Sequence, residues 1–232
     1  MKLYRNFTGV LFLVFTLIFS NVTKVYAISI KEKGEIKHKY SILIDVSEFD
    51  LYLIDKDTNK VVKDYPIAGG KRTTPSPYGT WKIVSKAANW GTGFGTRWMQ
   101  LNVPWGKYGI HGTNKPLTIN SPDSLGCIRM FNSDVNELYE FVDCGTDVVI
   151  YGGSYGLDKS TFRILAPGDR GADVFEVERR LKDKGYYSGR LDGIYENSLK
   201  KAVIKFKTDN KLKFTHYLDK EFYNALQMIP FD

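Results

Sequence analysis

Cys127 and His111 have the residue types and the spacing that acyl transfer through a thiol requires. A thiol nucleophile needs a base, because a free cysteine with a pKa of about 8.5 is only partly thiolate at neutral pH. Of the three histidines, only His111 lies in the same predicted domain as Cys127 and near it in the sequence. The pair suggests a nucleophile and its general base, although a lone Cys and a lone His are more often packing residues.

The residues around Cys127 add groups that acyl transfer uses. Gly126 permits a sharp turn, after which the N–H groups of Gly126 and Cys127 can face one point, as an oxyanion hole requires. Arg129 lies two residues further on and can hold a carboxylate by a paired hydrogen bond. The spacing alone establishes neither role.

These residues fall within one predicted β-rich domain, residues 40–151. A high aromatic content of 14% favours strands. Strand-like runs separated by turn residues are expected at 40–46, 50–54, 61–67, 80–84, 97–103, 108–111 and 147–151. One clear helix is expected at 132–142, with Asn132 or Ser133 as its cap. We therefore expect a mainly β domain, sandwich-like or barrel-like, with one main helix.

A second, small all-α domain is predicted at residues 164–228. Apolar residues at helical spacing predict a first helix through Val174 and Leu181 and a second through Leu199 and Phe206, and Asn197 or Ser198 can cap the second. A short third helix can be capped by Asp219. Three short helices form a marginal core, which favours a binding attachment over an enzyme.

The first 27 residues predict export. Basic residues precede an apolar run at 9–19, which has the length of a signal-peptide core and is short for a membrane span. We expect cleavage after Ala27; an uncleaved membrane anchor is the alternative. Residues 28–39 and 152–163 are expected to be linkers.

In an exported chain, the two cysteines Cys127 and Cys144 could form one disulfide. Their local settings favour a free reactive thiol at Cys127 and a packing role for Cys144. The net charge of +7 invites an anionic partner, but the sequence has no motif typical of nucleic-acid binding.

The two segments His111-Gly112-Thr113-Asn114 and Ser124-Leu125-Gly126-Cys127-Ile128-Arg129 together resemble the signature of the L,D-transpeptidase family, the YkuD-type catalytic domain. The resemblance covers nearly all of residues 40–151. The family often has a histidine before the Gly-Cys pair, where this chain has Leu125. The resemblance therefore implies that His111 is the base.

The resemblance implies a peptidoglycan L,D-transpeptidase. Cys127 would attack the L,D-peptide bond of a stem tetrapeptide and release D-Ala, and the thioester would pass to a neighbouring stem amine as a 3→3 cross-link. His111 would be general base and acid, oriented by the carbonyl of Gly112. The implied oxyanion donors are the N–H groups of Gly126 and Cys127, and the implied substrate-binding residues are Arg129, Ser124, Asn114 and Trp98. No metal or organic cofactor is implied, and a carbapenem-type β-lactam is the expected inhibitor.

The C-terminal domain is similar to the three-helix peptidoglycan-binding domain, through segments such as Pro167-Gly168-Asp169-Arg170-Gly171 and Leu191-Asp192-Gly193-Ile194-Tyr195. It departs from the family at Lys207, where glutamine is usual, and around His216-Tyr217. His216 is expected at the surface, without a metal. Peptidoglycan stem peptides and glycan are therefore the expected partners, outside the cytoplasm and at the cell wall.

Two alternatives remain beside transpeptidation, and a third lacks its motif. An L,D-carboxypeptidase would form the same thioester but use water as acceptor. A non-catalytic peptidoglycan-binding wall protein would keep the fold without a working pair. A sortase-like enzyme also uses Cys, His and Arg, but its Thr-Leu-x-Thr-Cys motif is missing here.

Overall fold

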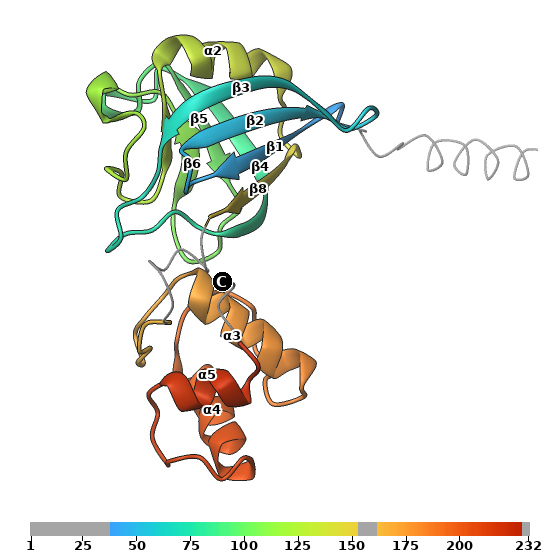
Figure 1. The fold of residues 1–232 in the computed structure, drawn as a ribbon, viewed down its shortest axis with the longest axis vertical. Helices are drawn as coiled ribbons and strands as arrows, with labels where there is room; N and C mark the ends of the chain where they lie inside the picture. Colours follow the sequence, from blue (N-terminus) through green and yellow to red (C-terminus); the bar gives the residue numbers. More distant parts are fainter. Residues whose placement is uncertain (1–37, 153–161, 229–232) are drawn as a thin grey trace, which may run out of the picture. The chain divides into compact units, whose positions relative to one another are not determined.

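The structure, a computed structural model, describes residues 38–152 and 162–228. Eight strands of the first range form a closed barrel in the order β1-β2-β3-β7-β6-β5-β4-β8 (Figure 1). Their bounds are β1 Tyr40–Asp45, β2 Asp50–Asp55, β3 Lys60–Ala68, β4 Gly79–Ala88, β5 Arg97–Leu101, β6 Tyr108–His111, β7 Ile128–Met130 and β8 Asp147–Tyr151. The pairs β1–β8 and β6–β7 are parallel, and the other neighbours are antiparallel. The expected mainly β, barrel-like domain is confirmed.

Alternation of apolar and polar residues directs one face of each strand into the barrel. In β1, Ile42 and Ile44 are almost completely buried, and in β2 Leu51 and Leu53 are completely buried. The residues between them point outward, as the two-residue period of a strand requires. The same alternation decides which side chains of β6 and β7 lie outside the core.

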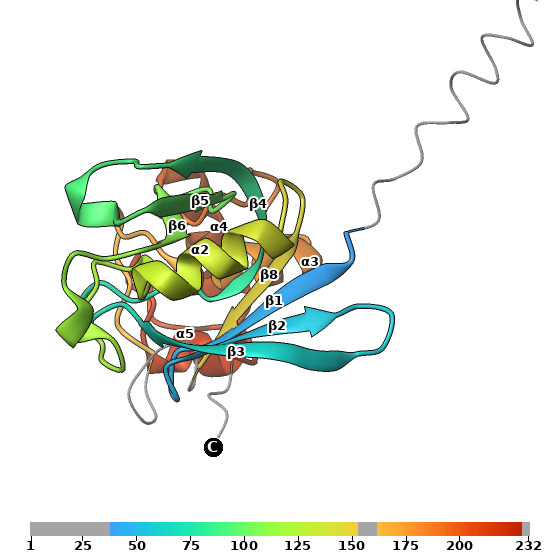
Figure 2. The same cartoon turned by 90° about the horizontal axis from the view of Figure 1, so that it is seen from above.

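The helix α2 (Asn132–Phe141) contacts β5 and β6 and can be followed across the barrel in Figure 2. Val135 and Leu138 are its buried residues. The expectation that Asn132 or Ser133 caps this helix is wrong: Phe131 is the N-cap residue, and no side chain caps it. The amide of Asn132 instead binds two loops, because its Oδ1 accepts from the Thr96 N–H and its Nδ2 donates to the Thr113 carbonyl.

The second described range contains three helices: α3 (Ala172–Asp183), α4 (Asn197–Asp209) and α5 (Lys220–Ala225). The expected Asp219 cap is confirmed, since its Oδ1 accepts from the Phe222 N–H at 3.0 Å. The cap expected for α4 is wrong, because its N-cap residue is Glu196 and no side chain caps it.

Two parts of the C-terminal domain that depart from the family pattern, Lys207 and the loop around His216-Tyr217, contact each other. Lys207 is 1% exposed, and its Nζ donates to the Thr215 hydroxyl at 2.9 Å and to the Tyr217 carbonyl at 2.6 Å. The buried lysine therefore fixes the unusual loop that contains His216 and Tyr217.

The segment expected to be a signal peptide or anchor, residues 1–27, lies outside the described residues, as do most of both linkers. Within the described ranges, no helix is long and apolar enough to cross a membrane. Cys127 and Cys144 are both free, so no disulfide joins them. Cys144 is exposed, which corrects its expected packing role.

Candidate active site

The parallel pairing of β6 with β7 positions the candidate residues. Ile110 pairs with Ile128, and both side chains are completely buried in the barrel. Their neighbours His111 and Arg129 also pair, so both lie on the opposite face of the sheet. Cys127 directly precedes β7, and its Sγ lies 4.0 Å from the carbonyl oxygen of Lys107, the residue before β6. His111 and Arg129, which are far apart in the sequence, thus lie side by side on one face of the sheet.

His111 is held in a defined tautomer. Its ring is only 3% exposed, and Nδ1 lies 2.5 Å from the carbonyl oxygen of Gly112. A carbonyl can only accept, so Nδ1 carries the proton and Nε2 is left with its lone pair. Two aromatic rings pack against the imidazole: Phe94 at 5.0 Å and Trp98 at 5.7 Å between centroids. This hydrogen bond joins His111 to the carbonyl that the sequence resemblance implied as its partner.

Burial lowers the pKa of His111 from its ordinary 6.5 to about 4. The nearby Arg129 cation lowers the pKa further, whereas the carbonyls of Gly112 and Phe94 oppose the shift. His111 is consequently neutral at neutral pH, which is the state a general base needs.

Because the pKa of His111 is lowered in the folded chain, we expect the free energy of unfolding to depend on pH. Between about pH 6.5 and pH 4, His111 is protonated in the unfolded chain but stays neutral in the folded chain. The stabilisation is therefore complete above pH 6.5 and is lost as pH falls toward 4, by up to about 3 kcal/mol. Urea unfolding at several pH values should show a steeper acid loss for the wild type than for His111→Gln. Equal losses would contradict a buried, neutral His111.

Cys127 is partly buried, and its Sγ lies 4.0 Å from the carbonyl oxygen of Lys107. Burial raises the pKa of the thiol, while the Gly109 backbone N–H and the Arg129 charge favour the thiolate. In the described part of the chain, no hydrogen bond joins Sγ to His111. At neutral pH the thiol of Cys127 and the imidazole of His111 are therefore both neutral. Proton transfer between them needs a hydrogen bond that forms when substrate binds, as is common in active sites.

The turn before Cys127 is held by Ser124. Gly126 has φ 116°, and a Cβ there would lie 2.7 Å from the Tyr108 ring, so only glycine fits. The Gly126 N–H donates to Ser124 Oγ at 2.9 Å. This amide, expected as an oxyanion donor, is already used within the turn. Ser124, expected to bind substrate, is completely buried.

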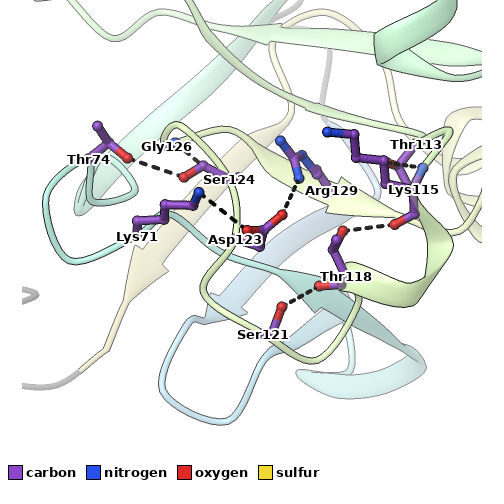
Figure 3. Close-up of polar contacts among 10 residues, drawn as sticks. All are labelled: Lys71, Thr74, Thr113, Lys115, Thr118, Ser121, Asp123, Ser124, Gly126 and Arg129. Atoms are coloured by element: carbon purple, nitrogen blue, oxygen red, sulfur yellow. Dashed lines mark hydrogen bonds and ion pairs between the residues drawn. The ribbon is translucent and has the colours of Figure 1, made fainter.

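A neighbouring loop fixes the same turn. The Ser124 carbonyl accepts from the Lys71 N–H at 3.0 Å and from the Thr74 hydroxyl at 3.2 Å. Figure 3 shows the Thr74 contact beside the bond between Ser124 and Gly126. The loop after β3 therefore sets the path of the chain into Cys127.

The remaining expected binding residues lie in different settings. Trp98 is 2% exposed and packs on His111, so its position suits support of the imidazole better than contact with a substrate. Asn114 is exposed. Arg129 is paired with Asp123, its NH1 being 3.3 Å from Oδ2.

Sequence reasoning missed Phe94, which covers the imidazole from the glycine-rich loop 89–96. Gly95 allows this loop to approach, because a Cβ there would meet Asn132 Oδ1 at 2.2 Å and the Gly112 carbonyl carbon at 2.6 Å. The glycines of loop 89–96 were a usable sequence signal for this close approach, because backbone segments that pack this tightly need residues without a Cβ. Among the described residues, no cluster of three or more His, Cys, Asp or Glu could hold a metal.

Comparison with known protein families decides the identity of this domain. Residues 39–150 match the L,D-transpeptidase catalytic domain, and residues 170–226 match a peptidoglycan binding domain. Residues 39–150 belong to the L,D-transpeptidase family. A C-terminal peptidoglycan-binding domain follows this L,D-transpeptidase domain in the chain.

Two curated relatives carry L,D-transpeptidase YkuD in their names. The Bacillus licheniformis protein is 44% identical over 111 residues, which are 48% of this chain and 65% of that protein. The Bacillus subtilis protein is 48% identical over 92 residues, which are 40% of this chain and 55% of that protein. This chain therefore spans less than two thirds of the length of either relative. The NMR structure of the catalytic domain of the E. faecium L,D-transpeptidase is 25% identical, with a TM-score of 0.42 over 50% of this chain and 100% of that one.

Proposed function

We propose that the chain is a peptidoglycan L,D-transpeptidase with Cys127 as nucleophile and His111 as general base and acid. The observation that carries the proposal is the parallel pairing of β6 with β7, which brings together the strand that ends at His111 and the strand that follows Cys127, with Nδ1 of His111 bound to Gly112. This tautomer directs the basic Nε2 away from Gly112 and makes it available to a thiol.

In the first half-reaction, Nε2 of His111 takes the Sγ proton, and the thiolate attacks the carbonyl between the L-centre of the diamino acid and D-Ala. The N–H of Cys127 stabilises the oxyanion; such donors contribute about 3 kcal/mol each. The Gly126 N–H joins it only if the bond to Ser124 Oγ opens. His111 then returns the proton to the leaving amine, the peptide bond breaks, and a thioester remains.

In the second half-reaction, the side-chain amine of a neighbouring stem attacks the thioester. His111 accepts a proton from the amine, the C–S bond breaks, and the proton returns to Sγ of Cys127. The product is a 3→3 cross-link, and the free enzyme is restored. A carbapenem-type β-lactam would acylate the same sulfur.

The C-terminal domain is proposed to hold the enzyme on the glycan and stem peptides of the wall. Peptidoglycan lies outside the cytoplasm, so the enzyme would work there, with residues 1–27 as signal peptide or anchor. The family match at residues 170–226 supports this part of the proposal.

Purified disaccharide-tetrapeptide tests the proposal when the products are read by mass spectrometry. We expect dimers that have lost one D-Ala. Tripeptide monomers without dimers would instead make the chain an L,D-carboxypeptidase. Unchanged substrate would contradict catalysis and leave a wall-binding protein.

A further inference from the structure

Asp123 lies between two cations beside the candidate active site. Its Oδ2 is 3.3 Å from NH1 of Arg129, and its Oδ1 is 3.3 Å from Nζ of Lys71. Figure 3 shows the three side chains in series, with Asp123 in the middle. Each carboxylate oxygen therefore has its own cation.

The three groups differ in exposure. The Arg129 side chain is 17% exposed, whereas Asp123 is 39% and Lys71 is 49% exposed. Hydrogen bonding to Lys71 is the main reason that the pKa of Asp123 is lowered, and Arg129 lowers it further. Asp123 is thus a stable anion, and the Lys71 contact holds it from the solvent side.

The backbone around Asp123 is fixed as well. The next residue, Ser124, bridges to Gly70, and its N–H donates to the Gly69 carbonyl at 2.9 Å. The Lys71 N–H donates to the Ser124 carbonyl. Asp123 and Lys71 are therefore carried by two segments that bind each other, so their side chains meet without much loss of freedom.

We propose that Asp123 is a positioning residue that holds the Arg129 guanidinium where β7 pairs with β6, at the position paired with His111 and two residues after Cys127. The inference rests on the proposed thiol chemistry and deepens it. Burial is the main cause of the pKa shift of both groups, and the Arg129 charge lowers the pKa of the Cys127 thiol and of His111. An arginine released into solvent would lose both effects, because screening by water weakens the interaction.

The test is the pH dependence of Cys127 alkylation by iodoacetamide, in a full-length Cys144→Ser background that removes the exposed second thiol. We expect Asp123→Asn to move the alkylation midpoint to higher pH by about half to one unit, in the direction of Arg129→Met. Asp123→Glu keeps the carboxylate, so its alkylation midpoint should lie closer to that of the wild type than the midpoint of Asp123→Asn. Asp64→Asn, which removes an exposed acid on β3, is the matched control and should leave the midpoint unchanged.

Two results would overturn the proposal. A shift of Asp123→Asn to lower pH would mean that Arg129 stays in place and Asp123 only screens its charge. An unchanged midpoint would mean that Arg129 needs no anchor. The double variant Asp123→Asn/Arg129→Met should shift no further than Arg129→Met alone, and thermal unfolding of each variant identifies one that fails to fold, for which Asp123→Glu carries the test. Alkylation needs no wall substrate, so failure of cross-linking in the wild type would leave this result readable.

Discussion

Cys127→Ala should reduce dimer formation from stem tetrapeptide to the uncatalysed background, a loss of at least about 10³-fold. Without the sulfur no thioester can form, and neither a water molecule nor the imidazole of His111 replaces it in the proposed steps. The measurement is muropeptide turnover followed by mass spectrometry. D-Ala release should stop together with cross-linking, because both depend on the same acyl-enzyme.

Cys144→Ala is the matched control for this loss. Cys144 is the second free cysteine and is exposed, so its removal should leave turnover near the wild-type rate. Dimers made by the Cys127→Ala enzyme at the wild-type rate would refute the nucleophile.

His111→Gln should slow acylation by about 10²–10⁴-fold, the usual contribution of a general base. Burial raises the pKa of the Cys127 thiol, so the sulfur cannot compensate with a large thiolate fraction at neutral pH. The measurement is the rate of acylation of Cys127 by a carbapenem, followed as a mass adduct.

The pH dependence separates loss of the base from a structural defect. Since the pKa of His111 is about 4, the wild type should retain its base in mildly acidic solution. The variant should instead gain rate steadily as pH rises and hydroxide forms the thiolate. His216→Gln, which changes a histidine of the other domain, should behave like wild type. A His111→Gln rate equal to wild type at neutral pH would exclude His111 as the base.

The sequence predicted the long strands of the barrel well, because alternating apolar residues mark them directly. It missed β7, since Ile128–Met130 has only three residues and forms its pairs with distant segments. Such pairing leaves no local pattern. The short strand is nevertheless what pairs Arg129 with His111, and it begins directly after Cys127.

Individual polar side chains were harder to predict than elements. Asn132 fits the local pattern of a helix cap, but tertiary contacts with Thr96 and Thr113 use its amide instead. Ser124 and Trp98 stand in or near the motif strands and were assigned to substrate, yet both are buried. A motif identifies which residues matter, whereas burial decides whether a residue meets substrate or supports its neighbours.

The central claim is that Cys127 carries the acyl group. The most direct measurement is the intact mass of the enzyme trapped with a stem tetrapeptide, followed by mapping of the modified peptide. The account predicts an adduct of the tetrapeptide minus D-Ala, on the peptide that contains Cys127 and absent from Cys127→Ala. An adduct on another residue, or one that persists in Cys127→Ala, would contradict it.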